Sequence, residues 1–595
     1  MSLPSGDDPE ITRTAHAMLI PWGVFARQVG LVQALEGVSI PQRRGEHAPQ
    51  TKLMEFLVAI LSGCAYLQDI SHGPHPLDQD QAVATAWGQA DWADYSGISR
   101  TLHACTAETV AAVRTALWQV SRPFMDREVM LALRERGALV YDGDLTGRPV
   151  SSTSKTYPGA AFGWMDDAVR LGYQAALVSM ASPSYGRLWL SVRVHPGDTV
   201  SCPQAEAMVR QAEASTGVRP RRRTELVAGR IQEKQGEVQA AQRRLGQGQD
   251  QLEAARSKMN AMAREWRRAL AEVARLVERD GSVEKAKHPY SQLSKARQKV
   301  GVYWRRLYRC SKAMEGARQA AARQAEKASA LQAELAALEQ HLVRLVEDNR
   351  TNRAPIPAIF RLDGGFGSGK NLAWLIEMGY EVYGKVISDK VTGALRRRMA
   401  ADPCRTPVGD NAEMVAWSAL KLDFCPYPLD MGLEHFYTGQ KERFATLVHY
   451  GPQPVAHDLR GWFDFYNGRQ TIEAGVKEGK SVFEMHHLKV RSVAGLAIQE
   501  EFASFAANLV RWAAAWLYEQ RPAPPAPFDR PQPSVKRLVR VAANTTAVVS
   551  RQPEGSLLLR FDELSPWKGS QLRIPSGWAL QPPLPLFTNE VLEPT

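Results

Sequence analysis

Residues 221 to about 350 constrain the fold of this chain more than any other stretch. The segment is rich in Ala, Gln, Glu, Arg and Leu, and its clearest interruption is the turn-like sequence RDGSVEKAKHPYSQ at 279–292. Two long helical patterns on either side of a turn predict an antiparallel helical hairpin. Each arm has roughly 55–60 residues, so each helix is expected to be about 80–90 Å long. The rest of the chain must fold around this insertion.

Strand and helix patterns before the hairpin predict an α/β domain that follows a helical N-terminal region. Residues 1–135 include KLMEFLVAILSGCAYLQDI, whose dense apolar periodicity is typical of packed helices. In residues 136–220, three short runs bounded by Gly, Pro and Asp predict strands, and one amphipathic run predicts a helix. The strand runs are ALVYDGDLTG, YQAALVSMAS and RLWLSVRVHPGD, and the helix run is CPQAEAMVRQAEAST.

The α/β pattern resumes after the hairpin. In residues 351–390, PAIFRLD and EVYGKVI predict strands and NLAWLIEMG a helix, so the hairpin interrupts one α/β domain. Residues 391–460 read as a mixed insertion with strand-like pieces. In residues 461–520 a long helix is expected from about Trp462. Residues 521–595 begin with a Pro-rich linker, and VKRLVRVAANTTAVVS and GSLLLRFDE predict strands of a small β-rich tail.

The composition favours a nucleic-acid partner and argues against a membrane or secreted protein. Lys and Arg number 74 against 63 Asp and Glu, which gives a net charge of +11. The six cysteines form no CxxC pair, so neither a disulfide framework nor a zinc module is expected. The N-terminus lacks a signal pattern, and the longest apolar run, around Leu57 to Leu67, is too short to span a bilayer. We therefore expect a cytoplasmic protein.

The stretch PAIFRLDGGFGSGKNLAWLIEMGY, residues 357–380, permits two interpretations. Gly364-x4-Gly369-Lys370 between a strand and a helix is close to a phosphate-binding P-loop. Beside a long coiled coil, this motif would indicate an ATPase of the chromosome-maintenance type. However, Asn371 stands where Ser or Thr should bind magnesium, and no downstream apolar strand ending in Asp is evident. The alternative is that Asp363, at the end of the strand, is a metal ligand and the glycines form its turn.

Further carboxylates could complete such a metal site. Asp142 and Asp144 in LVYDGDLTG point to one face of a strand, and either could join Asp363. Asp144 is favoured because it lies nearer the strand end, but the choice stays open. Magnesium in proteins is bound by a few carboxylates together with water and phosphate, and two such ions can activate one oxygen and stabilise another.

A third carboxylate lies in the helix expected after Trp462. Four polar residues fall within a band of about 60° on one face of that helix. They are Tyr466, Arg469, Glu473 and Lys480. Lys477 falls on the same face, so a carboxylate is flanked by cations and a phenol, which suits a metal ligand among phosphate contacts. The alternative is a solvated face with a Glu473–Lys477 pair. Asn467-Gly468 is a turn signal that could delay the helix start to Arg469.

The spacing Tyr466-x2-Arg469-x3-Glu473-x6-Lys480 resembles the YREK signature of a large family of bacterial insertion-sequence transposases. Asp144 and Asp363 resemble the first and second aspartates of the DDE triad, in the right order and each at a strand end. The helical sequences before residue 135 also look like the N-terminal region of one branch of this family. The resemblance covers about 50–515 apart from the hairpin.

The resemblance implies a ribonuclease H-like core, a mixed sheet flanked by helices. It implies two Mg²⁺ ions, with Mn²⁺ able to substitute, held by Asp144, Asp363 and Glu473. It also implies hydrolysis of the phosphodiester at transposon ends and joining of the freed 3′-hydroxyl to target DNA. The partner would be double-stranded DNA, bound by a homodimer that recognises terminal inverted repeats through residues 1–135.

Further roles follow from the same resemblance. Three of the polar helix residues, Tyr466, Arg469 and Lys480, would hold DNA phosphates, with Lys477 beside them. The glycines after Asp363, which are Gly364, Gly365 and Gly367, would let the backbone turn sharply. An aromatic residue of the 391–460 insertion would stack on a flipped base, and Trp417 and Tyr450 are candidates. A domesticated DNA-binding protein without turnover is the other alternative, against which the intact triad argues.

Two features stay outside the family pattern. The hairpin is not part of it, and dimerisation, reach along DNA and recruitment of a partner are all open. Its basic clusters, Arg221 to Arg223, Arg267-Arg268 and Arg305-Arg306, permit DNA contact, as does an ordinary solvated coiled coil. His486 and His487 are not expected to share a metal, because adjacent helical positions diverge by about 100°.

Overall fold

The computed structural model describes residues 11–43, 45–153, 155–165, 167–280, 291–401, 404–519, 534–562, 565 and 567–577. The predicted hairpin turn and Pro-rich linker lie largely outside these residues. The chain divides into two compact units. The first consists of the residues before Arg222 and after Thr351, and the second is Arg222–Thr351.

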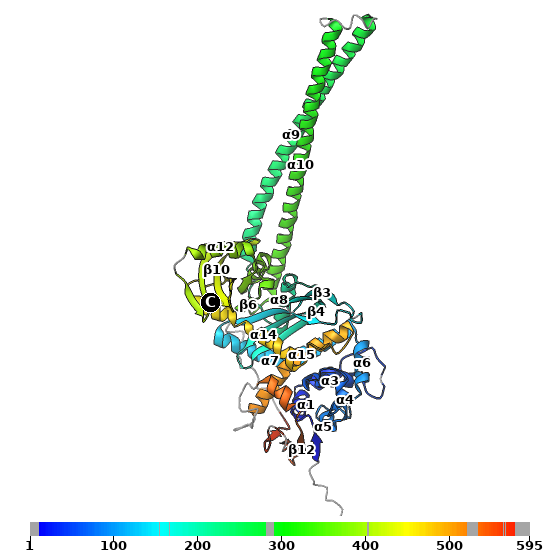
Figure 1. Cartoon of the computed structure of the whole chain (residues 1–595), viewed down its shortest axis with the longest axis vertical. Coiled ribbons are helices and arrows are strands. Elements are labelled where there is room, and N and C mark those ends of the chain that lie inside the picture. Colours follow the sequence, from blue (N-terminus) through cyan, green and yellow to red (C-terminus); the bar gives the residue numbers. More distant parts are fainter. Residues whose placement is uncertain are drawn as a thin grey trace, which may run out of the picture. The chain divides into compact units, whose positions relative to one another are not determined.

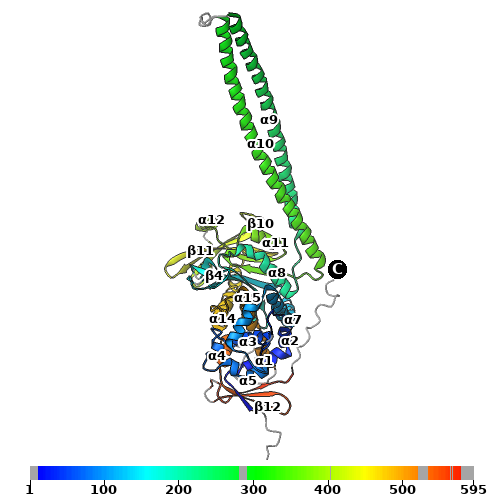
Figure 2. The same cartoon turned by 90° about the vertical axis from the view of Figure 1, so that its right-hand side faces the viewer.

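The second unit is the predicted antiparallel hairpin. Its helices are α9 (Thr224–Asp280) and α10 (Gln292–Thr351), which run side by side in both views (Figures 1 and 2). With 57 and 60 residues they are about 85–90 Å long. The seam between them is narrow, and many of its buried side chains are small. The buried apolar residues are Val227, Ile231, Val238, Ala241, Leu276, Leu293, Ala296, Ala321, Ala328 and Leu345.

A ten-stranded mixed sheet organises the first unit, which confirms the predicted α/β class. The strand β2 (Leu139–Pro149) lies between an antiparallel neighbour, β4 (Ala168–Ser182), and a parallel one, β6 (Ala358–Leu362). A further parallel strand, β7 (Glu381–Val386), follows β6. The hairpin insertion in the sequence therefore separates two strands that are adjacent in the sheet. The strands β2 and β6 have nearly continuous burial at their paired residues, as parallel strands covered on both faces do.

The sheet continues on both sides of these strands. On one side β5 (Gly186–Pro196) and the unpredicted β3 (Ala161–Met165) both pair with β4. On the other side the 391–460 insertion forms an antiparallel meander whose last strand pairs with β7. Its elements are α12 (Asp389–Ala400), β8 (Thr406–Gly409), β9 (Ala412–Leu422), β10 (Cys425–Thr438) and β11 (Lys441–Tyr450).

The helix α15 (Val493–Glu519) joins the sheet to the N-terminal helices. It packs on β5 and on α7 (Ala107–Arg136), where the rings of Trp512 and Phe124 stack with centroids 4.3 Å apart. Nearer its end Trp516 packs against Phe25, so the helix is apolar on several faces because it is covered on several sides. No helix in the described residues is long and apolar enough to cross a membrane.

The N-terminal region is helical as predicted, apart from one strand. Its helices before α7 are α1 (Leu19–Gln28), α2 (Leu31–Glu36), α3 (Pro49–Leu61), α4 (Asp69–His72), α5 (Gln81–Ala86) and α6 (Tyr95–Ala104). The strand β1 (Ile11–Thr14) pairs with β12 (Ala547–Arg551), more than 500 residues away. The predicted β-rich tail is completed by β13 (Leu557–Phe561) and β14 (Gln571–Ile574).

Two secondary-structure predictions were wrong. The first half of VKRLVRVAANTTAVVS is not a strand but a helical turn, α16 (Val535–Arg537) continued by a π-helical turn (Leu538–Ala542). Its buried residues recur with helical spacing, which the strand interpretation overlooked. They are Val535, Leu538, Val539 and Ala542. The long helix expected from Trp462 is broken into α13 (Leu459–Asn467), α14 (Gln470–Val482) and α15, with the first break at the Asn467-Gly468 turn signal.

Candidate active site

Three carboxylates predicted as metal ligands lie near one another where the pairing of two neighbouring central strands, β2 and β6, ends. Asp144 lies on β2 one residue beyond Gly143, which pairs with Leu362 of β6 in parallel register. Asp363 follows Leu362 directly, so the two aspartates occupy equivalent places on neighbouring parallel strands. Glu473 lies in the first turn of α14. Elements separated by the hairpin and by the meander thus bring together carboxylates that are far apart in sequence.

The guanidinium of Arg469 connects these carboxylates. Its Nη2 atom lies 2.8 Å from Oε1 of Glu473 and 3.6 Å from Oδ1 of Asp363, and the side chain is only 8% exposed. Burial lowers the pKa of Arg469, but its interactions with Tyr466, Asp363, Asp144 and Glu473 outweigh this and raise the pKa above its usual value. The Nη1 atom is buried and has no hydrogen-bond partner among the described residues. A buried, incompletely bonded cation therefore lies among the three acidic groups.

The carboxyl group of Asp144 has a raised pKa. Burial raises its pKa to about 6, Arg469 counteracts this, and the charges of Asp363 and Glu473 raise it further. A divalent cation would favour the ionised form, as nearby positive charge does for any carboxylate. The electrostatics of the cluster therefore favour binding of positive charge.

The sequence left Asp142 and Asp144 as alternatives, and their environments differ. Asp142 is fully buried and accepts two hydrogen bonds from Arg361, at 2.6 and 2.8 Å. Nη2 of Arg187 lies 3.5 Å from the same carboxylate. These partners neutralise Asp142, so it serves as a buried ion-pair anchor between β2, β6 and β5. Asp144 is left as the carboxylate that faces Asp363 and Glu473.

Tyr466 does not share a helix face with Glu473, contrary to the prediction. It belongs to α13, and Arg469 is the residue that precedes α14. The phenol is nevertheless close to the site, because its hydroxyl donates to the carbonyl of Leu362 at 3.2 Å. Its side chain is buried, so in this conformation it supports the end of β6. Lys477 and Lys480 lie further along α14, with Lys477 exposed and Lys480 half-buried.

The donor set fits magnesium in kind, because three carboxylates supply hard oxygen ligands. They are not gathered around a single point. Among the described residues, the group of three potential ligands whose atoms all lie within 4.8 Å is a different one. Two ions about 3.5–4 Å apart do not need all three carboxylates to meet at one point, because the ligands are shared between the two ions.

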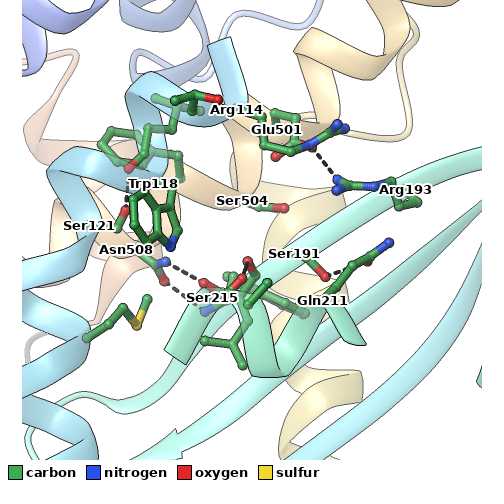
Figure 3. Close-up of a pocket in the computed structure, with 17 residues that line it drawn as sticks. Arg114, Trp118, Ser121, Ser191, Arg193, Gln211, Ser215, Glu501, Ser504 and Asn508 are labelled. Atoms are coloured by element: carbon green, nitrogen blue, oxygen red, sulfur yellow. Dashed lines mark hydrogen bonds and ion pairs between the residues drawn. The ribbon is translucent and has the colours of Figure 1, made fainter. Parts of the chain in front are cut away.

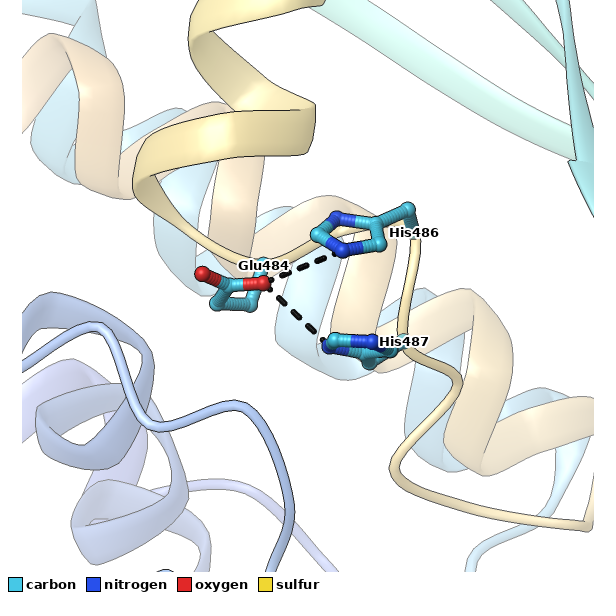
Figure 4. Close-up of side chains that lie close together, drawn as sticks. All are labelled: Glu484, His486 and His487. Carbon is cyan, nitrogen blue, oxygen red and sulfur yellow. Dashed lines mark ion pairs between the residues drawn. The ribbon is translucent and has the colours of Figure 1, made fainter.

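That different group is Glu484, His486 and His487 (Figure 4). The prediction that the two histidines diverge was wrong, because α14 ends at Val482 and both lie in the turn that follows. Nε2 of His486 lies 3.3 Å and Nδ1 of His487 3.2 Å from Oε2 of Glu484. The other oxygen of Glu484 is paired with Arg540. The carboxylate is thus already neutralised by a cation, and the cluster links the end of α14 to the π-helical turn.

The glycines after Asp363 allow a close approach and not a left-handed turn. The chain does turn sharply after the strand, as predicted, in a 3₁₀ turn over Gly364–Phe366, and none of Gly364, Gly365 and Gly367 has positive φ. A Cβ atom on Gly367 would lie 1.9 Å from the carbonyl oxygen of Lys385 on β7. The loop therefore packs directly on the neighbouring strand, and this contact fixes the chain just beyond Asp363.

The same loop differs from a phosphate cradle. In a P-loop the backbone N–H groups point at phosphate. Here the N–H groups of Phe366, Gly367 and Ser368 donate to carbonyls within the loop. The N–H of Asn371 donates to the side chain of Ser368, and its amide donates to the carbonyl of Phe366. These bonds engage three of the loop's backbone N–H groups, Phe366 to Ser368, with its own carbonyls, and those groups therefore do not point at a phosphate as in a P-loop.

A separate cavity of about 380 Å³ lies between α7, β5, α8 (Ala205–Thr216) and α15 (Figure 3), and no sequence pattern predicted it. Trp118 forms one wall, and Glu501 pairs with Arg114 at 2.7 Å and with Arg193 at 2.9 Å at its rim. None of the three candidate metal ligands lines this cavity. Its walls come from elements almost 400 residues apart, and their contact could not be read from local patterns.

The aromatic candidates for base stacking have packing partners. Arg398 lies over the ring of Trp417 at 5.2 Å, and Tyr450 packs against Tyr427 with centroids 6.2 Å apart. Both rings are half-buried. The position of neither residue identifies it as the aromatic that stacks on a flipped base.

In comparisons with known proteins, no family model matches the sequence, and no curated protein is significantly similar to it.

Proposed function

We propose that the chain is a DNA transposase of the DDE class that carries the YREK signature. The observation that supports this most is the convergence of Asp144, Asp363 and Glu473 around Arg469. The three residues come from the two sides of a 130-residue insertion and from beyond a strand meander. Carboxylates without a shared role would not be expected to cluster at the ends of two parallel strands beside a buried arginine.

The strand order is consistent with a ribonuclease H-like core. The strands β5, β4 and β2 are antiparallel, and β6 and β7 then run parallel to β2. On this proposal the meander and the hairpin are insertions into that core. The 1–135 region would bind the terminal inverted repeats, and a homodimer would assemble on double-stranded DNA in the bacterial cytoplasm.

The proposed chemistry assigns a role to each group. Asp144, Asp363 and Glu473 would hold two Mg²⁺ or Mn²⁺ ions, which supply an activated water and neutralise charge on the phosphate. The Nη1 donor of Arg469, which is buried and has no partner among the described residues, would bind a phosphate oxygen beside the scissile bond once DNA binding uncovers it. Lys477 and Lys480 on α14 would hold neighbouring phosphates. Tyr466 would fix the end of β6, and through it the position of Asp363.

The test is cleavage of a supercoiled plasmid that carries the DNA flanking the gene, with Mg²⁺ and without ATP. We expect breaks at fixed positions in the flanking DNA, made equally well by Lys370→Ala. The rival ATPase predicts no such breaks and an ATP hydrolysis that Lys370→Ala abolishes. A domesticated DNA-binding protein would bind the flanking DNA and cut nothing.

A further inference from the structure

The net charge of the chain is concentrated in one half of the hairpin. Residues 256–312, which we call the tip half, contain 16 Lys and Arg and only 5 Asp and Glu. Their excess of 11 equals the net charge of the whole chain, +11. Residues 222–255 and 313–351, the base half, contain 11 residues of each sign, and the rest of the chain is also balanced. All other parts of the protein are therefore neutral in sum.

The basic side chains of the tip half are accessible. All 14 that the structure describes are exposed. They are Arg256, Lys258, Arg264, Arg267, Arg268, Arg275, Arg279, Lys295, Arg297, Lys299, Arg305, Arg306, Arg309 and Lys312. Arg268 pairs with Glu265 and Arg275 with Glu272 on the same helix, at 2.8 and 2.9 Å. Exposed pairs of this kind contribute little and exchange readily with other anions.

Aromatic rings are placed among these cations. Trp266 of α9 and Trp304 of α10 pack across the hairpin with ring centroids 5.4 Å apart, and Trp304 is 52% exposed. Tyr308, one turn further along α10, is 55% exposed, and the ammonium of Lys312 lies 5.4 Å from the centroid of its ring. The surface thus combines positive charge with flat apolar faces that can lie against sugars.

The length of the charged region matches a duplex. The part of α9 within the tip half, residues 256–280, extends over about 37 Å at 1.5 Å per residue. One turn of B-DNA is about 34–36 Å long, and the duplex carries one charge per ~1.7 Å. A hairpin laid against the backbone would therefore meet phosphates along its whole charged length.

A solvated coiled-coil surface does not explain this distribution. Such surfaces usually mix acidic and basic residues, which form pairs along and between helices. The base half follows that pattern, with Lys234 paired to both Glu237 and Glu334. The tip half belongs to the same hairpin but lacks the acidic residues to balance it. Unbalanced like charge disfavours the compact pair of helices unless a polyanion binds.

We propose that the tip half of the hairpin binds the phosphate backbone of duplex DNA without reading its sequence. The charge and exposure argue for a polyanion by themselves, whereas the choice of DNA rests on the proposed function. The tip half would then be a DNA-binding surface in addition to the carboxylate cluster.

The experiment compares two sixfold variants of the full chain that lose the same charge. The tip variant replaces Arg264, Arg267, Arg268, Arg305, Arg306 and Arg309 with Gln. The base variant replaces Arg243, Arg244, Arg318, Arg323, Lys327 and Arg344, which are also exposed, with Gln. Gln has nearly the helix propensity of Arg, and circular dichroism would verify that both hairpins stay helical. Binding to a random-sequence 30-base-pair duplex is measured in EDTA over a series of salt concentrations.

We expect the tip variant to lose at least tenfold in affinity at about 0.1 M salt, and the base variant to stay within twofold. The slope of log K against log salt should become shallower by about 0.9 for each phosphate that the variant no longer neutralises. Equal losses in both variants would indicate bulk charge and overturn the proposal, as would unchanged binding by the tip variant. Tighter binding of a matched RNA duplex or single strand would overturn the assignment to duplex DNA.

These outcomes are separable from those for the transposase. Binding in EDTA requires no cleavage, so Asp363→Asn should bind the random duplex as the wild type does. If the wild type cuts its flanking DNA while the tip variant binds normally, the hairpin proposal fails and the transposase stands. If the tip half carries binding but no DNA is ever cut, the transposase fails and the hairpin proposal stands.

Discussion

The guanidinium of Arg469 donates a hydrogen bond of 2.8 Å to the carboxylate of Glu473, four residues further along the chain. The same nitrogen lies 3.6 Å from Asp363. Because Arg469 precedes α14 and Asp363 follows β6, this one side chain sets the distance between a helix and a strand end. Arg469 therefore holds two of the proposed metal ligands, Asp363 and Glu473, close to each other.

Arg469→Gln should lower the rate of DNA cleavage by about 100-fold or more. It removes the cation that pairs with Glu473 and Asp363, and it also removes a hydrogen-bond donor to a DNA phosphate. Arg469→Lys should recover only part of this rate, because an ammonium cannot form the planar fork. Single-turnover cleavage measures both. Arg460→Gln is the control, because Arg460 forms an exposed pair with Asp464 on α13. A wild-type rate in Arg469→Gln would remove this arginine from the site.

Asp144→Asn should stabilise the metal-free protein at pH 7. The folded pKa of Asp144, about 6, lies above the ordinary value of 3.8, so its ionised form costs stability. This cost is absent below about pH 4, grows as the pH rises to about 6 and is constant above. The melting temperature of Asp144→Asn should therefore exceed that of the wild type at pH 7 and equal it at pH 4.

Thermal melts in EDTA across this range make the comparison. Added Mg²⁺ should reverse it by stabilising the wild type more than the variant. A difference in melting temperature that does not change with pH would contradict a raised pKa at Asp144.

Asp142→Asn should destabilise the protein by about 3–5 kcal/mol, because it leaves the buried guanidinium of Arg361 without its charged partner. Arg187, also near this carboxylate, would lose a partner as well. Urea unfolding measures the loss. An Asp142→Asn protein that keeps wild-type stability but cannot cut DNA would show that Asp142, and not Asp144, is the first metal ligand.

Gly367→Ala should reduce both stability and cleavage. Its Cβ would lie 1.9 Å from the carbonyl oxygen of Lys385, so the loop must move and carry Asp363 with it. The matched control is Gly393→Ala in α12, where an added Cβ meets no atom within 4 Å. That change should be neutral or stabilise by up to about 1 kcal/mol. Unchanged cleavage in Gly367→Ala would mean that the loop does not position Asp363.

Much of the fold could be predicted from local patterns. The hairpin, the strands β2, β4, β5, β6 and β7 and the helix α8 have clear periodicity and turn signals at their ends. The strand β1 could not be predicted, because its partner β12 lies more than 500 residues away. The break before α14 was signalled by Asn467-Gly468, but the helical-face argument for Tyr466 assumed an unbroken helix.

The site was predicted as a set of residue types at strand and helix ends. The sequence could not show which of Asp142 and Asp144 is neutralised by buried arginines and which is available as a metal ligand. Asp142 and Asp144 point to the same face of β2, and what distinguishes them is that Arg361 on the neighbouring strand and Arg187 on β5 pair with Asp142. The clustering of His486 and His487 was missed for a similar reason. It depends on where α14 ends.

The role of the three carboxylates is tested most directly by the rate of nicking at the fixed flanking site, measured with Mg²⁺ for the wild type and for Asp144→Asn, Asp363→Asn and Glu473→Gln separately. Each substitution keeps the shape of the side chain and removes one charged ligand. We expect all three variants to lose at least about 1,000-fold in cleavage rate while still binding the DNA. A wild-type rate in any of them would contradict a site in which these three carboxylates together hold the catalytic metal ions.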